Sequence, residues 1–290
     1  MSEELPAIAF KDLTRDFPIG LRGYKLRALE KVSFNVPVKG IYGLLGPNGS
    51  GKSTSIKIIL GLLTPSSGTC EVLGTSAGSQ QSKKHLGYLP ENPHFPSFLS
   101  GKELVEYFAG LSGISGKLAR QKVGEVLDWV GMEKAAERKV RTYSKGMLQR
   151  IGLAQALVHD PEILILDEPL SGLDPEGTQE VIDLLIDLRD RGKTILISSH
   201  LLSRVEEVCN QVAILHKGRV IHEGPLQELL ENESQTTYIQ LSGTQSSKTM
   251  ESLTRKLEGE NLKVQSMGSV KRPLDEVFLE ILKKDRESQK

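Results

Sequence analysis

The sequence predicts an α/β protein with a mostly parallel sheet, and two observations predict it. Short, continuous apolar runs occupy residues 41–45, 163–166 and 194–199, as in strands that are covered on both faces of a parallel sheet. Stretches with helical spacing separate these runs, which indicates βαβ units. Each run is followed by residues that can carry chemistry: a glycine-rich loop, a pair of acids or a histidine. Since open α/β sheets bind ligands at the carboxyl ends of their strands, we expect one shared site there.

The segment after the first run is a phosphate-binding loop. Residues 46–54 read GPNGSGKST, which fits G-x-x-x-x-G-K-[ST]. Its glycines let backbone N–H groups turn inward around an anion, and a helix predicted over 53–63 adds its N-terminal dipole. A chance match in a glycine-rich turn is the alternative. We therefore predict a P-loop NTPase core in which Lys52 reaches the β- and γ-phosphates and Ser53 ligates Mg²⁺. The predicted ATP-binding set is Gly46, Pro47, Asn48, Gly49, Ser50, Gly51, Lys52, Ser53 and Thr54.

Two acids follow the second apolar run. Asp167 and Glu168 are placed where the strand over 163–166 ends. Asp167 would hold Mg²⁺, and Glu168 would polarise the attacking water as a general base. The alternative is a strand that ends in a solvated acidic turn, which the phosphate loop disfavours.

A second anion site is predicted far along the chain. Residues 143–150 read YSKGMLQR, in which Ser144 can cap a helix that begins at Lys145 and ends at 160–161. Gly146 leaves the backbone accessible, and a helix N-terminus that exposes N–H groups binds anions. Capped helices occur in every α/β protein, so this segment alone is a weak signal.

With these motifs in this order, residues 5–225 resemble the ATP-binding cassette (ABC) family of ATPases. Residues 143–150 resemble the family signature motif, in the form found in bacterial export-type (ABC-2-like) members. In that family the signature motif of one subunit binds the γ-phosphate of the ATP molecule that the other subunit holds. The resemblance therefore implies a head-to-tail homodimer with two ATP molecules and Mg²⁺ at its interface, and separate transmembrane permease subunits.

The resemblance also assigns roles to single residues. His200 matches the switch histidine that contacts the γ-phosphate, a catalytic position; it could instead begin the following helix. Asp174 matches the turn that passes the sister subunit's site, although it is also a good helix start before Pro175. Phe17 occupies the position of the adenine platform, with Tyr24 as a rival, and either ring could simply be packed.

One position departs from the family pattern. Glu91 stands where most relatives carry glutamine, in the loop that joins the core to the helical subdomain. A carboxylate can bind Mg²⁺ through water or orient the nucleophile, but at neutral pH it cannot donate a hydrogen bond. We expect a variant of the usual site.

Composition sets limits on the partners. The 290 residues include 37 acids and 37 bases, so the balanced charge predicts no binding to nucleic acid. Two cysteines are too few for a disulfide framework. No apolar stretch reaches the roughly 20 residues that span a bilayer, and the N-terminus lacks the apolar core of a signal peptide. We expect a cytoplasmic protein, held on the inner face of the cell membrane through permease subunits.

The chain divides by composition into two parts. Residues 1–225 form the predicted ABC ATPase domain, with a helical subdomain at about 97–160 and antiparallel strands near 7–10, 29–36 and 69–73. Residues 226–290 would form a small C-terminal α+β accessory domain with a strand at 237–241 and a helix within 272–284. Three apolar residues after the Glu91 loop would lie near a membrane partner or in the core: Phe95, Phe98 and Leu99.

The predicted function is the ATP-hydrolysing subunit of an ABC transporter, an exporter. The alternative is a non-transport ABC ATPase that acts in translation or repair. A single cassette, and the lack of heptads between the phosphate loop and the signature, disfavour it. A regulatory module that binds ATP without cleaving it is disfavoured by the presence of Asp167, Glu168 and His200 together.

Overall fold

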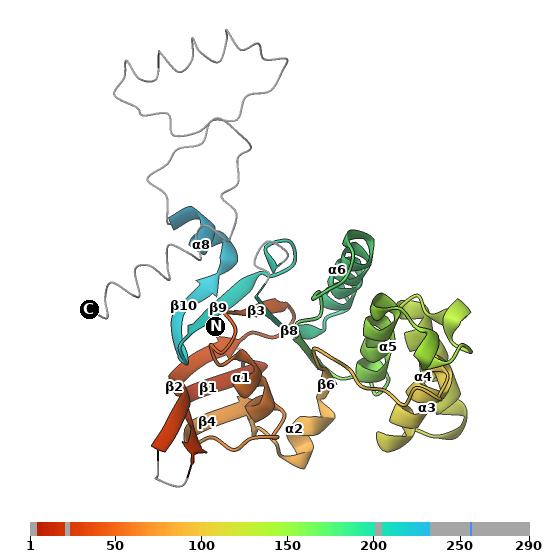
Figure 1. Cartoon of the computed structure of the whole chain (residues 1–290), viewed down its shortest axis with the longest axis horizontal. Coiled ribbons are helices and arrows are strands. Elements are labelled where there is room, and N and C mark those ends of the chain that lie inside the picture. Colours follow the sequence, from red (N-terminus) through yellow and green to blue (C-terminus); the bar gives the residue numbers. More distant parts are fainter. Residues whose placement is uncertain (1–4, 21–23, 201–204, 233–255, 257–290) are drawn as a thin grey trace.

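The computed structural model describes residues 5–20, 24–200, 205–232 and 256, and it contains two sheets (Figure 1). The larger sheet has the order β10-β9-β3-β8-β7-β6, and its strands are parallel except for the antiparallel pair β9 and β10. The smaller sheet is antiparallel, with the order β2-β1-β4-β5. The strands are β1 (Ile8–Ile19), β2 (Tyr24–Val36), β3 (Ile41–Leu45), β4 (Ser67–Val72), β5 (Thr75–Ser76), β6 (Leu86–Leu89), β7 (Ile163–Asp167), β8 (Thr194–Ser199), β9 (Gln211–His216) and β10 (Arg219–Pro225).

The parallel strands are apolar throughout because they are covered on both faces. All five residues of β3 are buried. Ile41 and Leu45 join a core with the helices, while Tyr42 and Leu44 join a second core with the antiparallel sheet. The mostly parallel α/β fold and the adjoining antiparallel strands, which the sequence predicted, are confirmed.

Two helices are shorter than predicted. The helix after the phosphate loop, α1 (Lys52–Ile59), ends before residue 63 because Gly61 has a φ of 70° and packs against Gly78. Its buried face still includes Ile56 and Ile59, which place it between the two sheets. The helix after Ser144 ends at residue 157, and the backbone leaves the helical region at Asp160, with a φ of 59°.

Helices α3, α4 and α5 lie within residues 97–160, the range predicted for the helical subdomain. Residues 112–115 separate α3 from α4, and a capping box between Ser100 and Glu103 starts α3. The Arg191 guanidinium lies 4.7 Å from the centre of the Trp129 ring and so connects α6 to α4. The bounds are α2 (Gln80–Lys84), α3 (Gly101–Leu111), α4 (Gly116–Trp129), α5 (Lys145–Leu157), α6 (Pro175–Asp190) and α8 (Leu226–Asn232), with short 3₁₀ turns at Glu133–Ala135 and Val140–Thr142.

The chain continues past β10 into α8, whose Leu226 and Leu229 are buried in the core beside the parallel sheet. The predicted strand at 237–241 and the helix within 272–284 lie outside the described residues. Within the described ranges, none of the helices combines the length and apolar character that a bilayer crossing requires.

Candidate functional site: a phosphate loop and an acidic strand end

Glycines shape the loop between β3 and α1. Gly46 has a φ of 151°, and a Cβ added there would lie 2.2 Å from the Leu215 carbonyl oxygen. Gly51 precedes α1 with a φ of 114°, and a Cβ there would lie 2.5 Å from a methyl group of Leu29. Larger residues would therefore force the loop away from β9 and β2. The Ser50 hydroxyl in this loop is buried and has no hydrogen-bond partner among the described residues, so it is available to bind a ligand.

The side chain of Lys52 points into the loop from the first turn of α1. Its Nζ donates to the Gly46 carbonyl at 2.7 Å and to the Pro47 carbonyl at 3.4 Å. Burial lowers the pKa of Lys52, whereas the charges of Glu168, Asp167 and Glu91 raise it. The ammonium therefore feels the negative charge of all three carboxylates that the sequence assigned to the site, including the exposed Glu91.

The two acids lie at the end of β7, and both are buried. Ser198 on β8 donates its hydroxyl to Asp167 Oδ1 and accepts the Glu168 N–H at 3.1 Å. Glu168 Oε1 lies 3.7 Å from Lys52 Nζ. Glu168 has a positive φ of 52°, a strained conformation for this residue that the surrounding contacts must hold. Sequence analysis did not identify Ser198, although a serine inside an apolar strand was a signal that could have found it.

His200 completes this cluster from the end of β8. Its Nδ1 lies 2.9 Å from Glu168 Oε2, and its backbone N–H donates to the same oxygen at 3.4 Å. The fold thus brings Lys52, Glu168 and His200 into contact from three neighbouring elements. A cation, a carboxylate and an imidazole in this arrangement can bind an anion and move a proton.

The donors predicted for Mg²⁺ fit its chemistry. Ser53 is exposed at the start of α1, and Asp167 ends the strand that follows β8 in the sheet. The described part of the chain holds no group of three or more His, Cys, Asp or Glu side chains that could bind a metal alone. Mg²⁺ in nucleotide sites is held by one or two protein ligands together with phosphate and water, so this small donor set is suitable.

The residues of the second predicted anion site lie elsewhere. Ser144 caps α5 by accepting the Met147 N–H at 3.3 Å, as predicted. Asp174 caps α6 by accepting the Gly177 N–H at 2.8 Å. Figure 1 shows α5 set apart from α1, and no hydrogen bond or ion pair among the described residues joins Ser144, Gly146 or Asp174 to Lys52. A single chain therefore does not assemble all the predicted residues.

The start of α5 lies next to the turn at residues 171–174, which precedes α6. A Cβ added at Gly146 would lie 3.9 Å from Leu173, and one at Gly172 would lie 2.2 Å from the Lys145 ammonium. The start of α5 and the turn at 171–174 therefore form one continuous edge.

The two rival rings differ in their surroundings. Phe17 is half-buried on β1, and the Arg15 guanidinium lies 4.6 Å from its ring centre. Tyr24 begins β2 and is 70% exposed. Sequence analysis did not identify Arg15, although its spacing of two residues from Phe17 on one strand was a signal that could have found it.

The turn between β9 and β10, far from the phosphate loop in the sequence, forms a hydrogen bond with that loop. The N–H of Gly218, between β9 and β10, donates to the Ser50 carbonyl at 2.9 Å. The Gly218 carbonyl accepts the Glu30 N–H at 2.8 Å, so β2, this turn and the loop are connected in series.

Comparisons with known proteins agree with this geometry. The family model described as ABC transporter matches residues 29–171. An uncharacterized ABC transporter ATP-binding protein of Nostoc sp. is 45% identical over 74% of this chain, and the match covers 64% of that protein, less than two thirds of its length. The Nod factor export ATP-binding protein I of Burkholderia orbicola is 36% identical over 78% of this chain and 77% of that protein. A solved dimeric ATP-binding cassette in a post-hydrolysis state, bound to ADP and Pi, is 26% identical over 76% of this chain and 98% of that chain, with a TM-score of 0.68.

Proposed function

This chain belongs to the ABC transporter family, and we propose that it is the ATP-hydrolysing subunit of an exporter whose membrane path lies on separate permease subunits. The observation that carries the proposal is the contact of Glu168 with both Lys52 and His200 beside the phosphate loop. The relatives described above are transporter proteins, which disfavours the alternative in translation or repair.

Each residue of the cluster has a step in hydrolysis. Lys52 and the N–H groups of the loop bind the β- and γ-phosphates, and Ser53 and Asp167 would hold Mg²⁺, which would offset the charge that develops on the phosphates. Glu168 accepts a proton from the attacking water. His200 contacts the γ-phosphate and orients Glu168 through their 2.9 Å contact.

The second half of the site comes from another copy of the chain. Ser144, Gly146 and Asp174 lie on the edge formed by α5 and the 171–174 turn, apart from the phosphate loop of their own chain. We propose that this edge faces the phosphate loop of a partner copy and binds the γ-phosphate there, in a head-to-tail homodimer with two ATP molecules. The dimeric cassette with ADP and Pi supports this arrangement.

The helical subdomain supplies a surface for the membrane partner. Phe98 is 72% exposed, whereas Phe95 packs edge-to-face on Phe108 and Leu99 packs against the core. Of the three residues that the sequence left open, Phe98 is thus the one available for contact. Other large apolar side chains exposed on this subdomain are Tyr107, Leu111 and Leu118. We propose that this surface, with the Glu91 loop, receives the permease on the cytoplasmic side of the cell membrane.

The proposed direction of transport rests on the names of the relatives. The Burkholderia protein is named as a Nod factor export protein, and export is our proposal for this chain as well. Selection of the cargo would belong to the permease subunits.

The test is the replacement Glu168→Gln, measured by steady-state phosphate release from MgATP. Loss of the general base should lower turnover by about a hundredfold or more while ATP binding is retained, because the amide cannot take the proton. Glu71→Gln, at an exposed glutamate on β4, is the matched control and should turn over normally. Normal turnover by the Glu168 variant would remove this residue from the mechanism.

A further inference from the structure

The Arg15 side chain is held between a ring and a carbonyl. Its guanidinium lies 4.6 Å from the centre of the Phe17 ring, and its Nη1 donates to the Thr64 carbonyl at 2.6 Å. Its Nε is buried and has no hydrogen-bond partner in the described part of the chain. The Arg15 guanidinium is therefore held in position mainly by the Phe17 ring and by the Thr64 carbonyl, which follows α1 in the chain.

This pair lies on the side of β1 that faces the phosphate loop. Arg15 is opposite Leu29 in the β1–β2 pair, and directly opposed residues of an antiparallel pair share a face. Leu29 is the residue whose methyl group would contact a Cβ at Gly51. Phe17 is two positions after Arg15, so its ring points to the same face, as the stacking contact requires.

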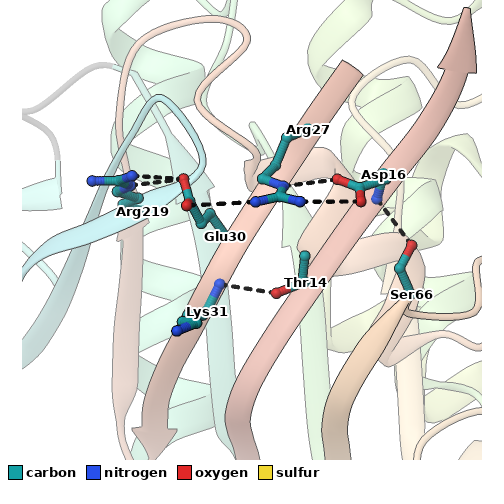
Figure 2. A network of polar contacts seen from close by, with 7 residues as sticks. All are labelled: Thr14, Asp16, Arg27, Glu30, Lys31, Ser66 and Arg219. Atoms are coloured by element: carbon teal, nitrogen blue, oxygen red, sulfur yellow. Dashed lines mark hydrogen bonds and ion pairs between the residues drawn. The ribbon is translucent and has the colours of Figure 1, made fainter. Parts of the chain in front are cut away.

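Polar contacts around Asp16 fix the position of this part of β1 (Figure 2). Arg27 pairs with Asp16 at 2.9 Å and with Glu30 at 3.6 Å, and Arg219 of β10 pairs with Glu30 at 2.8 Å. The Asp16 N–H donates to Ser66 Oγ at 3.0 Å, next to a register shift between residues 15 and 16. Exposed ion pairs add little stability each. Together they hold the strand that carries Arg15 and Phe17 against β2 and β10.

We propose that Arg15 is a positioning residue for the nucleotide base: it covers one face of the Phe17 ring and leaves the opposite face for the adenine to stack on. This inference rests on the proposed function and on the adenine role of Phe17. The guanidinium on one face fixes the orientation of the Phe17 ring. The base can then stack on the other face, so that guanidinium, ring and base lie parallel to one another.

The experiment compares two magnesium-bound probes, ATP and inorganic tripolyphosphate, by titration calorimetry. Arg15→Ala should weaken ATP binding by about three- to tenfold and leave tripolyphosphate binding unchanged, because only the base needs the ring. Arg120→Ala is the control: it removes an exposed arginine on α4, outside the β1–β2 pair, and binding of both probes should stay at the wild-type value. Arg15→Lys keeps the charge without the planar group, should also weaken ATP alone, and serves if the alanine variant does not fold.

A double substitution decides whether Arg15 acts through Phe17. In the background of Phe17→Ala, Arg15→Ala should cause no further loss of ATP affinity. Equal weakening of both probes by Arg15→Ala would show a role of its charge alone and overturn the inference. Unchanged ATP binding, or the same loss in both backgrounds, would also overturn it. Failure of the wild-type protein to bind either probe would instead overturn the proposed function.

Discussion

The hydroxyl of Ser198 contacts both acids of the site. It donates to the Asp167 carboxylate and accepts the N–H of Glu168, whose positive φ needs external support. Ser198 is fully buried, so removing its oxygen leaves two polar groups without this partner.

Ser198→Ala should therefore destabilise the fold by about 1–3 kcal/mol and reduce ATP turnover, because Asp167 and Glu168 lose the contact that aligns them. Ser55 gives a matched control, since its hydroxyl is fully buried in α1 but has no hydrogen-bond partner in the part of the chain that the structure describes. Ser55→Ala should be neutral or stabilising. Urea unfolding and phosphate release measure the two effects, and equal stability losses in both variants would contradict the role given to Ser198.

His159 makes the stability of the fold sensitive to pH. Burial lowers its pKa below the ordinary value, while its Nε2 lies 3.0 Å from the Leu86 carbonyl. Below about pH 6.5 the unfolded chain binds a proton that folded His159 does not. The free energy of unfolding therefore decreases as the pH is lowered through that range.

His159→Gln keeps a donor for the Leu86 carbonyl without the titrating ring. The loss of stability between pH 7.5 and 5.5, followed by urea unfolding, should be smaller in this variant than in the wild type. An identical loss in the two proteins would show that His159 does not contribute to it.

The residues of the site were predictable where a local motif exists. The phosphate loop and the two acids have fixed spacings, because a loop around an anion and the end of a strand are both local structures. Ser198 and Gly218 act through contacts with residues distant in the sequence, and no spacing marks such contacts.

At the scale of elements, β6 and α5 approach each other at Gly87. A Cβ added there would lie 2.3 Å from the Ala156 carbonyl oxygen and 2.8 Å from a methyl group of Leu164. Gly124 lies inside α4, where an added Cβ would meet none of the described atoms within 4 Å.

The two glycines should therefore respond in opposite ways to alanine. Gly87→Ala should cost about 1–3 kcal/mol of stability because backbone atoms must move. Gly124→Ala should add about 0.5–1 kcal/mol, since alanine is the better helix former and the site is open. Chemical unfolding of both variants measures the difference; a stable Gly87 variant would show that β6 can shift without cost.

Element types were easier to predict than element ends. Strands buried on both faces must be apolar throughout, so β3, β7 and β8 were evident in the sequence. The last turns of α1 and α5 depend on Gly61 packing against Gly78 and on the backbone at Asp160, which a hydrophobic pattern does not encode.

At the scale of the whole molecule, the separation of the two predicted anion sites makes a mixing experiment informative. Lys52→Ala disables the phosphate loop, and Ser144→Arg disables the edge that would face the partner's loop. Each variant alone should be inactive. In a head-to-tail dimer of the two variants, one site combines both defects and the other has none.

Mixing the two inactive variants should therefore restore ATPase activity, up to roughly a quarter of the wild-type value when subunits pair at random and sites act independently. Phosphate release from the mixture measures it, with each variant at the same total concentration as the control. A mixture as inactive as its components would contradict a shared site.

The connection from Ser50 through Gly218 to Glu30 has a mechanical consequence. The phosphate loop is braced from outside its own motif, by a hairpin turn that leads directly through β10 into α8. A molecule that binds beside α8 and displaces the β9–β10 turn would therefore shift the phosphate loop without contacting the nucleotide. ATP binding should therefore respond to contacts made at α8 as well as to contacts at the phosphate loop itself.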